Sequence, residues 1–284
     1  MRARSKRQRT GRGVTLQAEQ ADRHALYQRS VQDPEAEVAQ LDDLFRRLRG
    51  RSPLSLREDF CGTALLATQW CRSDPRRTAI GVDLCRDTLE WGRLHNVEPA
   101  GKEIASRIHL VQDNVLDVRT DPVDLVCGFN FSYNGLLDRA SLRRWFENAA
   151  SSLTEEGLLV LDCYGGSEAF DTVEEERDIE GEFTFVWEQA SFNPIDHRAE
   201  CHIHFRFPDG SALERAFSYR WRIWTLPEIR DLLAEAGFSS IHVFWEQFEE
   251  GEEEDEYLVS TGRYEEVAEA ENQESWICYV AAAR

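Results

Sequence analysis

The regular alternation of strand and helix patterns between Leu54 and Tyr164 is the feature that most restricts the fold of this chain. Short apolar runs typical of buried strands are separated by stretches whose apolar residues recur at helical spacing. Strands that alternate with helices form parallel sheets, because each helix returns the chain across the sheet in a right-handed crossover. We therefore expect an α/β protein with a doubly wound, mostly parallel sheet. The expected strands cover 54–59, 78–83, 107–113, 123–130 and 157–164, and the expected helices cover 63–71, 87–96 and 141–153.

The pattern changes after Tyr164. Three alternating stretches are separated by turn residues, as is typical of antiparallel strands, and a helix and two further strands follow. We expect one domain over 21–284 with a seven-stranded main sheet, a small antiparallel β cover inserted at about 181–224, and a disordered basic tail over 1–20. The stretches behind this division are 183–189, 200–207 and 214–224 for the cover, 225–238 for the helix, and 239–246 and 275–282 for the last strands.

Charge is distributed unevenly along the chain. The net charge is −20, yet the first twelve residues contain six basic side chains and no acid. An acidic body repels phosphate backbones, so nucleic acid is an expected partner only through this tail. The other interpretation of the tail is a solubilising arm. The acidic run over 249–256 predicts a solvated hairpin loop.

Apolar runs and cysteines restrict the compartment. No apolar run approaches the roughly 20 residues of a transmembrane helix, so no membrane partner is expected. No apolar stretch follows the basic N-terminus as it would in a secretory signal. The seven cysteines are scattered and form no CxxC pair. Free thiols fit a reducing, cytoplasmic location. The sequence leaves the oligomeric state open.

The stretch SLREDFCGTALLATQW, which begins within the first expected strand and continues through the loop after it, holds a single glycine, Gly62. Dinucleotide-binding turns use several glycines to approach a pyrophosphate, and Phe60 and Ala64 occupy the outer positions here. A ligand without phosphates needs less room, but its ribose needs an acid. Asp83 ends the second strand 21 residues beyond Gly62, and Asp113 ends the third, where it could bind an adenine amino group. A nucleoside without phosphates indicates S-adenosylmethionine.

The ordered set of motifs resembles the class I S-adenosylmethionine-dependent methyltransferases over residues 22–284. In that family an acid ends the first strand and a CGTG-like loop follows. Glu58 takes the place of the acid, Cys61-Gly62-Thr63 match the loop, and Ala64 replaces its last glycine. The segment after the fourth strand is also similar to that of glycine N-methyltransferase-like enzymes. The motifs are EDFCGTA, GVD, VQDNV, VCGFNFSYNGLL, GLLVLDCYGG and YRWRIWTLPEIRDLLAEAGF.

The resemblance implies S-adenosylmethionine as the cofactor, bound at the carboxyl ends of the strands. Asp83 falls on the ribose acid of the family and Asp113 on its adenine acid. Tyr27 would either contact the cofactor or pack within the first helix, and Arg57 would pair with a carboxylate or the cofactor. The expected cofactor-binding residues are Tyr27, Arg57, Glu58, Phe60, Cys61, Gly62, Thr63, Asp83, Leu84, Asp113, Asn114, Val115 and Asn130.

Methyl transfer depends mainly on positioning, so the catalytic candidates are side chains at strand ends that would border the methyl group. Aromatic residues of the cover could bind a cationic acceptor, and an arginine there could bind a carboxylate; packing within the sheet is the other interpretation. His202 and His204 are interpreted as ordinary strand residues, and no metal is expected. The candidates are Asn130, Tyr133 and Tyr164 for catalysis, and Tyr133, Tyr164, Trp187, Trp221 and Arg222 for substrate binding.

These features predict an S-adenosylmethionine-dependent methyltransferase of the EC 2.1.1 class that acts on a small amine or amino-acid-like acceptor. Two alternatives stay open. One is an RNA or protein methyltransferase tethered by the basic tail. The other is a non-catalytic cofactor-binding protein of the same fold.

Overall fold

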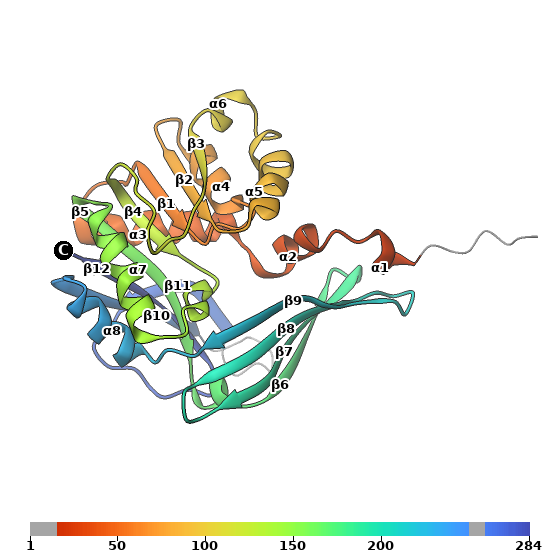
Figure 1. The fold of residues 1–284 in the computed structure, drawn as a ribbon. Helices are drawn as coiled ribbons and strands as arrows, with labels where there is room; N and C mark the ends of the chain where they lie inside the picture. Colours follow the sequence, from red (N-terminus) through yellow and green to blue (C-terminus); the bar gives the residue numbers. More distant parts are fainter. Residues whose placement is uncertain (1–15, 250–258) are drawn as a thin grey trace, which may run out of the picture.

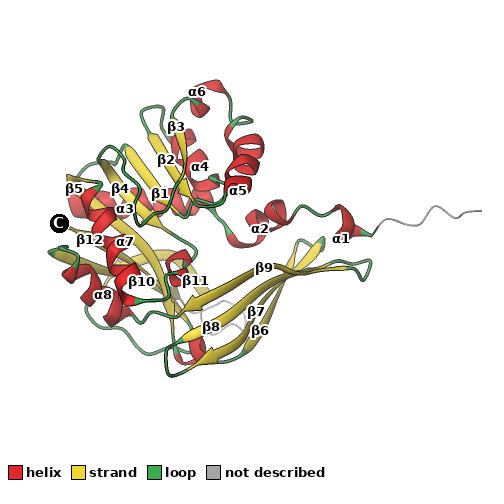
Figure 2. Cartoon of the chain, in the orientation of Figure 1, coloured by secondary structure: helices red, strands yellow, loops and turns green. Residues whose placement is uncertain are grey.

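A computed structural model describes residues 16–249 and 259–284, and its largest feature is a twisted sheet of eight strands (Figures 1 and 2). The strand order is β11-β10-β12-β5-β4-β1-β2-β3. Strands β1 to β5 run parallel to one another, whereas β12 lies between β5 and β10 and is antiparallel to both. The predicted doubly wound α/β sheet is thereby confirmed. The bounds are β1 Ser55–Asp59, β2 Thr78–Asp83, β3 Ile108–Gln112, β4 Val123–Gly128, β5 Leu153–Gly165, β10 Ser240–Glu249, β11 Val259–Glu266 and β12 Trp276–Ala283.

The sheet has one strand more than the seven expected. β11 pairs antiparallel with the outer edge of β10, and the ring of Tyr264 lies edge-on to that of Tyr279, with centroids 4.7 Å apart. The sequence of β11 lacks the alternation of a half-buried strand. An edge strand needs only to satisfy the open backbone groups of its neighbour, so a polar sequence can form one. The hairpin loop expected over 249–256 lies outside the described residues, except for Glu249 at the end of β10.

Helices cover both faces of the main sheet, since successive strand residues point to opposite faces. On one face Leu41 and Trp70 pack with the strand residue Leu125. On the other, Trp145 packs with Leu159. The helices are α3 Pro34–Arg49, α4 Leu65–Ser73, α5 Arg86–Gly92 with a π-helical turn η1 Arg93–Val97, α6 Lys102–Ala105, α7 Arg139–Ser151 and α8 Leu226–Glu235, with short 3₁₀ turns η2 Ser132–Gly135 and η3 Ser167–Phe170.

Local signals in the sequence explain where the longer helices begin and end. Asp33 caps α3 by accepting a hydrogen bond from the Ala36 N–H at 3.1 Å, and Gly50 ends that helix with a left-handed backbone. Thr225 and Glu228 form a reciprocal capping box at the start of α8. The apolar residues of α3 and of α8 belong to the two different cores, so these helices cover opposite faces of the sheet.

A second, antiparallel sheet forms the expected cover, in the order β6-β7-β8-β9. Figure 1 shows it beside the main sheet as a separate curved layer. The cover begins at Val173 with β6, a strand that was not predicted from the sequence, whereas the expected start was near residue 181. That strand is rich in exposed acids, which protect an edge strand from further pairing but hide its strand pattern. The bounds are β6 Val173–Ile179, β7 Phe183–Asn193, β8 Arg198–Arg206 and β9 Ala212–Arg222.

The N-terminal segment forms two short helices, α1 (Gln17–Gln20) and α2 (Arg23–Val31). Disorder was expected up to residue 20, and that boundary is wrong for α1. The Gln17 N–H donates to Asp209 Oδ2 at 2.8 Å, and the Ala18 N–H donates to Ser211 Oγ at 3.1 Å. These bonds hold α1 against the turn between β8 and β9. The rest of the expected basic tail, residues 1–15, lies outside the described residues.

Across the described residues, no helix combines the length and the apolar character needed to span a membrane. All seven cysteines are free, and only Cys85 among them is exposed.

Candidate active site

The loop between β1 and α4 is a tight turn with unusual backbone angles. Phe60, Gly62 and Ala64 all have left-handed conformations, with φ of 59°, 53° and 55°. Backbone bonds hold the turn: the Cys61 N–H donates to the Val82 carbonyl at 3.0 Å. A left-handed backbone costs a non-glycine residue about 1–2 kcal/mol. The loop therefore adopts conformations suited to glycine even where Phe60 and Ala64 stand in its place.

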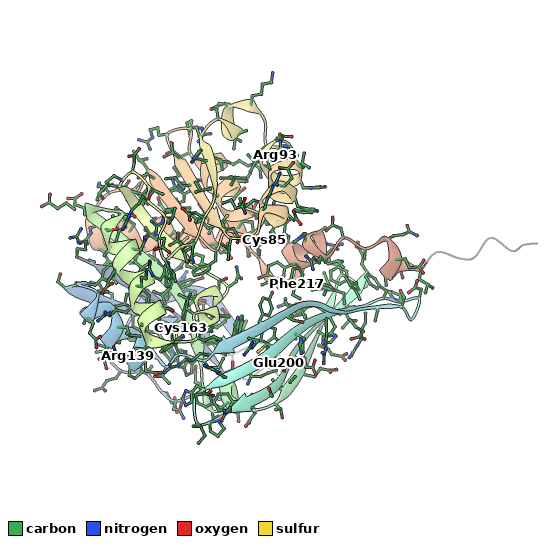
Figure 3. The ribbon with its side chains drawn as sticks, viewed as in Figure 1. Cys85, Arg93, Arg139, Cys163, Glu200 and Phe217 are labelled. Atoms are coloured by element: carbon green, nitrogen blue, oxygen red, sulfur yellow. The ribbon has the colours of Figure 1, made fainter. Side chains whose placement is uncertain are left out.

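Asp83 joins this loop to the neighbouring strand ends. Its Oδ2 accepts a hydrogen bond from the Gly62 N–H at 2.9 Å, and its Oδ1 accepts one from the Cys85 N–H at 2.7 Å. The Asp113 N–H donates to the Asp83 carbonyl at 3.2 Å. Figure 3 labels Cys85 at this edge of the sheet. Leu84 is 69% exposed beside it, so an apolar side chain and two acids border the same open edge.

The remaining expected residues of this edge take up different positions. The Thr63 hydroxyl accepts a hydrogen bond from Gln28 Nε2 at 2.6 Å, which ties the loop to α2. Asn114 Oδ1 accepts one from the Leu116 N–H at 3.0 Å. Val115 is buried in the hydrophobic core, so only its backbone can reach a ligand at this edge.

Three carboxyl groups, Glu37, Glu58 and Asp162, lie buried near this edge, and we call them the acid group. Burial, together with repulsion from Asp162, raises the pKa of Glu37 to about 8. Burial raises the pKa of Asp162 to about 7. The pKa of Glu58 is raised well above its usual range by burial and by Glu37. Among the described residues none of the three forms a salt bridge, and Glu37 Oε2 has no hydrogen-bond partner.

Arg57 does not reach this site. It points to the opposite face of β1, where it is fully buried and donates to Asp59 Oδ2 and to Ser152 Oγ at 2.8 and 2.7 Å. Trp145 Nε1 donates to the same Asp59 oxygen at 2.7 Å. The carboxylate partner of Arg57 is therefore Asp59, and we remove Arg57 from the cofactor-binding set.

A cavity of about 710 Å³ lies between the cover sheet and the strand ends. Five expected site residues line it: Tyr27, Asn130, Tyr164, Trp187 and Trp221. The Trp187 and Trp221 rings lie 5.3 Å apart, centroid to centroid, and form part of an aromatic wall. Lining residues that the sequence did not indicate include Phe131, Glu168, Asp171, Glu175 and Tyr219.

Two expected substrate-binding residues lie elsewhere. Tyr133 is 1% exposed and stacks on Trp145, and its hydroxyl donates to the Asp162 carbonyl at 2.9 Å. Arg222 lies over the Trp224 ring and donates to Glu228 at 2.9 Å, at the start of α8. Both side chains stabilise the body of the protein, and neither lines the cavity.

Among the described residues that line the cavity, Tyr164 is the one whose buried hydroxyl is available to a ligand. It lies at the end of β5, and its ring packs against that of Phe131 at 4.7 Å. Its hydroxyl is buried and has no hydrogen-bond partner within the described part of the chain. Burial raises the pKa of Tyr164 well above its usual value, so the hydroxyl is neutral at physiological pH. A buried hydroxyl without a partner is costly unless a ligand satisfies it.

Helix α2 closes the site by bridging the two layers (Figure 1). His24 packs between Trp91 of α5 and Phe217 of β9, with ring centroids 5.2 and 5.8 Å apart. Trp91 Nε1 donates to Asp22 Oδ2, the N-cap of α2, at 2.7 Å. Figure 3 shows Phe217 on the side of the cover that faces α2. Tyr27 of the same helix lines the cavity, and its ring lies 5.1 Å from that of Phe217, centroid to centroid.

The two cover histidines make ordinary strand contacts. His202 Nδ1 lies 2.9 Å from Ser218 Oγ, and His204 Nε2 lies 3.0 Å from Glu188 Oε2. In the described parts of the chain, no cluster of His, Cys, Asp or Glu has the arrangement of a metal site.

The strand order and the site at the carboxyl ends define a class I methyltransferase fold, which the comparison with solved structures supports. CalS10, a SAM-bound amino pentose methyltransferase from Micromonospora echinaspora involved in calicheamicin biosynthesis, is 16% identical, with a TM-score of 0.63 over 96% of this chain and 99% of that one. KedS8, a sugar N-methyltransferase from Streptoalloteichus sp. ATCC 53650, is 18% identical, with a TM-score of 0.58 over 100% and 99%.

A SAM-dependent methyltransferase from Clostridium acetobutylicum is 15% identical, with a TM-score of 0.62 over 92% of this chain and 98% of that one. No protein-family model and no curated protein sequence matches the chain. At such low identities the likeness establishes the fold.

Proposed function

We propose that this protein is an S-adenosylmethionine-dependent methyltransferase that acts on the amino group of a small molecule. The observation that carries the proposal is the acid group. Three buried carboxyl groups without a basic partner create a site that favours a cation. These groups can ionise to stabilise a cation but offer no positive charge to a phosphate, and S-adenosylmethionine carries a sulfonium and an ammonium group.

The residues at the carboxyl edge fit such a cofactor. Asp83 has carboxylate lone pairs left for ribose hydroxyls after its two backbone bonds. Asp113 is suited to the adenine amino group, and the exposed side chain of Leu84 to the face of the ring. When bound, the cofactor supplies an electrophilic methyl group. The loop from Phe60 to Thr63 and the turn at Asn130 would set its orientation.

The cavity supports an amine as the acceptor. Glu168, Asp171 and Glu175 contribute carboxylates to its lining, against a single basic residue, Arg220. Electron-rich aromatic walls also favour a cation. Attack requires the unprotonated amine, and the neutral hydroxyl of Tyr164 could accept or donate a hydrogen bond to that nitrogen. The similar structures include an amino pentose methyltransferase, a sugar N-methyltransferase and a glycopeptide N-methyltransferase. These descriptions agree with an amine as the acceptor.

Calorimetry tests the cofactor assignment. S-adenosylmethionine and S-adenosylhomocysteine should bind, and NAD and ATP should not. A bound cation favours the ionised forms of Glu37 and Asp162, so binding near pH 7 should release protons. The apparent binding enthalpy should therefore depend on the ionisation enthalpy of the buffer. Binding of NAD with comparable affinity would contradict the proposal.

Turnover is tested with methyl-labelled cofactor and a panel of small-molecule amines, with their N-acetylated forms as matched controls. Label should appear in amines and not in the acetylated compounds. Tight cofactor binding without transfer to any acceptor in a broad metabolite pool would instead support a non-catalytic binding protein.

A further inference from the structure

The turn that follows β4 is held by one carboxylate from the neighbouring strand. Asp162 lies near the end of β5 and is 8% exposed. Its Oδ2 accepts a hydrogen bond from the Asn130 N–H at 2.7 Å, and its Oδ1 accepts one from the Phe131 N–H at 3.0 Å. Asn130 and Phe131 both line the cavity. Each carboxylate oxygen of Asp162 therefore binds one of two consecutive amides of a cavity-lining turn.

The backbone of this turn is strained. Asn130 and Phe131 have φ of 55° and 54°, so two successive non-glycine residues are left-handed. Such conformations persist only where the surroundings enforce them, and they cluster at functional sites. Hydrogen bonds from amides to an ionised carboxylate are stronger than those to a neutral acceptor. The Tyr133 hydroxyl, which donates to the Asp162 carbonyl, adds a third bond between the turn and β5.

We propose that Asp162 is a positioning residue. Its carboxylate fixes Asn130 and Phe131 in the left-handed conformation, and this conformation presents the turn to S-adenosylmethionine and to the amine acceptor. The part of this inference that concerns ligands rests on the proposed function. The hold on the backbone does not, and it can be measured without any ligand.

The chain offers a matched control for a purely structural role. Asp124 is also 8% exposed, and it also accepts two backbone N–H groups, from Leu54 at 2.7 Å and Ser55 at 3.4 Å. It lies at the amino end of β4, at the opposite edge of the sheet from the site. Asp124→Asn should therefore weaken two comparable backbone bonds, together with the ion pair of Asp124 with Arg51, without disturbing the turn.

The first measurement follows the amide proton of Phe131 by NMR in protein labelled with ¹⁵N-phenylalanine, with the resonance assigned through Phe131→Leu. In the parent protein this resonance should move with a midpoint near pH 7, as the carboxyl group to which it donates titrates. The movement should be absent in Asp162→Asn and retained in Asp124→Asn. A Phe131 amide resonance at the same position in the parent and in Asp162→Asn at every pH would overturn the hold on the backbone.

The second measurement is cofactor affinity by calorimetry. Asp162→Asn should weaken S-adenosylmethionine binding at least tenfold, whereas Asp124→Asn should stay within about twofold of the parent. Equal affinities in the two variants would refute the positioning role even if the amide resonance changed. Failure of the parent to bind the cofactor would refute the proposed function instead, and the NMR result would still decide whether Asp162 holds the turn.

A second variant keeps the test decisive if Asp162→Asn does not fold. Glycine adopts the left-handed conformation without steric cost, so adding Phe131→Gly should restore folding if Asp162 acts by enforcing this backbone. Continued failure of the double variant to fold would contradict the inference.

Discussion

Replacing Glu37 by glutamine should make the ligand-free protein more stable at alkaline pH. Glu37 lies on α3, its Oε2 has no hydrogen-bond partner, and no basic side chain of the described residues pairs with it. Burial and the nearby Asp162 raise its pKa from 4.5 to about 8. In the unfolded chain the same carboxyl group ionises at its ordinary pKa. Between these two values the folded protein binds more protons than the unfolded one, so its stability falls as pH rises.

The size of the effect follows from this shift. Each unit of pKa corresponds to about 1.4 kcal/mol, so raising the pKa from 4.5 to about 8 sets an upper limit near 5 kcal/mol on the loss of stability between those pH values. Asp162 and Glu58 titrate with Glu37, so removing one member relieves only part of the repulsion. We expect Glu37→Gln to gain about 1–3 kcal/mol at pH 8.5, or several degrees in melting temperature, and almost nothing near pH 4.5.

The assay is thermal unfolding between pH 4.5 and 9, with Glu35→Gln as the matched control. Glu35 lies in the same first turn of α3 but is exposed, so its replacement should cause a small loss that does not depend on pH. Glu37→Gln should also weaken S-adenosylmethionine binding, because one of the groups that favour a cation is gone. If Glu37→Gln were less stable than the parent at every pH, Glu37 would have a stabilising partner and the reasoning would be wrong.

Three further predictions concern separate parts of the site. Asp83→Ala should weaken S-adenosylmethionine binding at least tenfold by calorimetry, since charge-assisted bonds contribute roughly 1.5–3 kcal/mol each; the exposed neighbour Asp87→Ala should not, and equal effects would remove Asp83 from the site. Trp221→Ala should lower acceptor turnover on the order of a hundredfold with cofactor affinity within a few-fold, whereas Arg222→Ala, outside the cavity, should keep turnover. Gly92→Ala should lower the melting temperature by several degrees, since its Cβ would lie 2.2 Å from the Thr63 carbonyl oxygen. Gly135→Ala, whose Cβ would have nothing within 4 Å, should leave the melting temperature unchanged. Similar melting temperatures for both variants would show that the loop around Thr63 moves freely.

The fold was predictable from the sequence because its central strands are buried and its longer helices α3, α7 and α8 have capping residues. The missed elements include α1, β6 and β11, and these three have a different origin. Each is stabilised by backbone pairing or by contact with another part of the chain, and none buries a regular apolar face of its own. Hydrophobic periodicity predicts segments that bury an apolar face. It does not predict a strand that only pairs with the edge of a sheet, or a short helix that only contacts a turn.

The candidate site was predictable where strand ends determine position. Asp83 and the loop around Gly62 meet as expected, since parallel strands end at one edge of the sheet. Arg57 was misplaced because adjacent strand residues face opposite sides, so Arg57 and Glu58 cannot share a site. Asp162 could have been predicted as a site residue, because a single acid within an apolar strand needs hydrogen-bond partners in the folded protein. Glu37 carried another, since it precedes Leu41 by four residues on the apolar face of α3.

The distribution of charge around the cavity resolves a conflict in the chemistry of amine methylation. A cation-favouring site attracts an ammonium group, but the same carboxylates would keep that nitrogen protonated and unreactive. In this structure two carboxylates of the cavity lining are exposed: Glu168 lies in the turn η3 before the cover, and Glu175 lies on β6, the edge strand of the cover. The lining residues at the strand ends, Asn130 and Tyr164, are neutral, and Asp162 is turned toward the backbone of the turn beside them. In the proposed reaction an ammonium group would be attracted by these exposed acids, whereas the groups at the strand ends are uncharged. In that reaction the proton would leave to solvent or to the exposed carboxylates, and the free lone pair of the nitrogen would attack the methyl group of the cofactor.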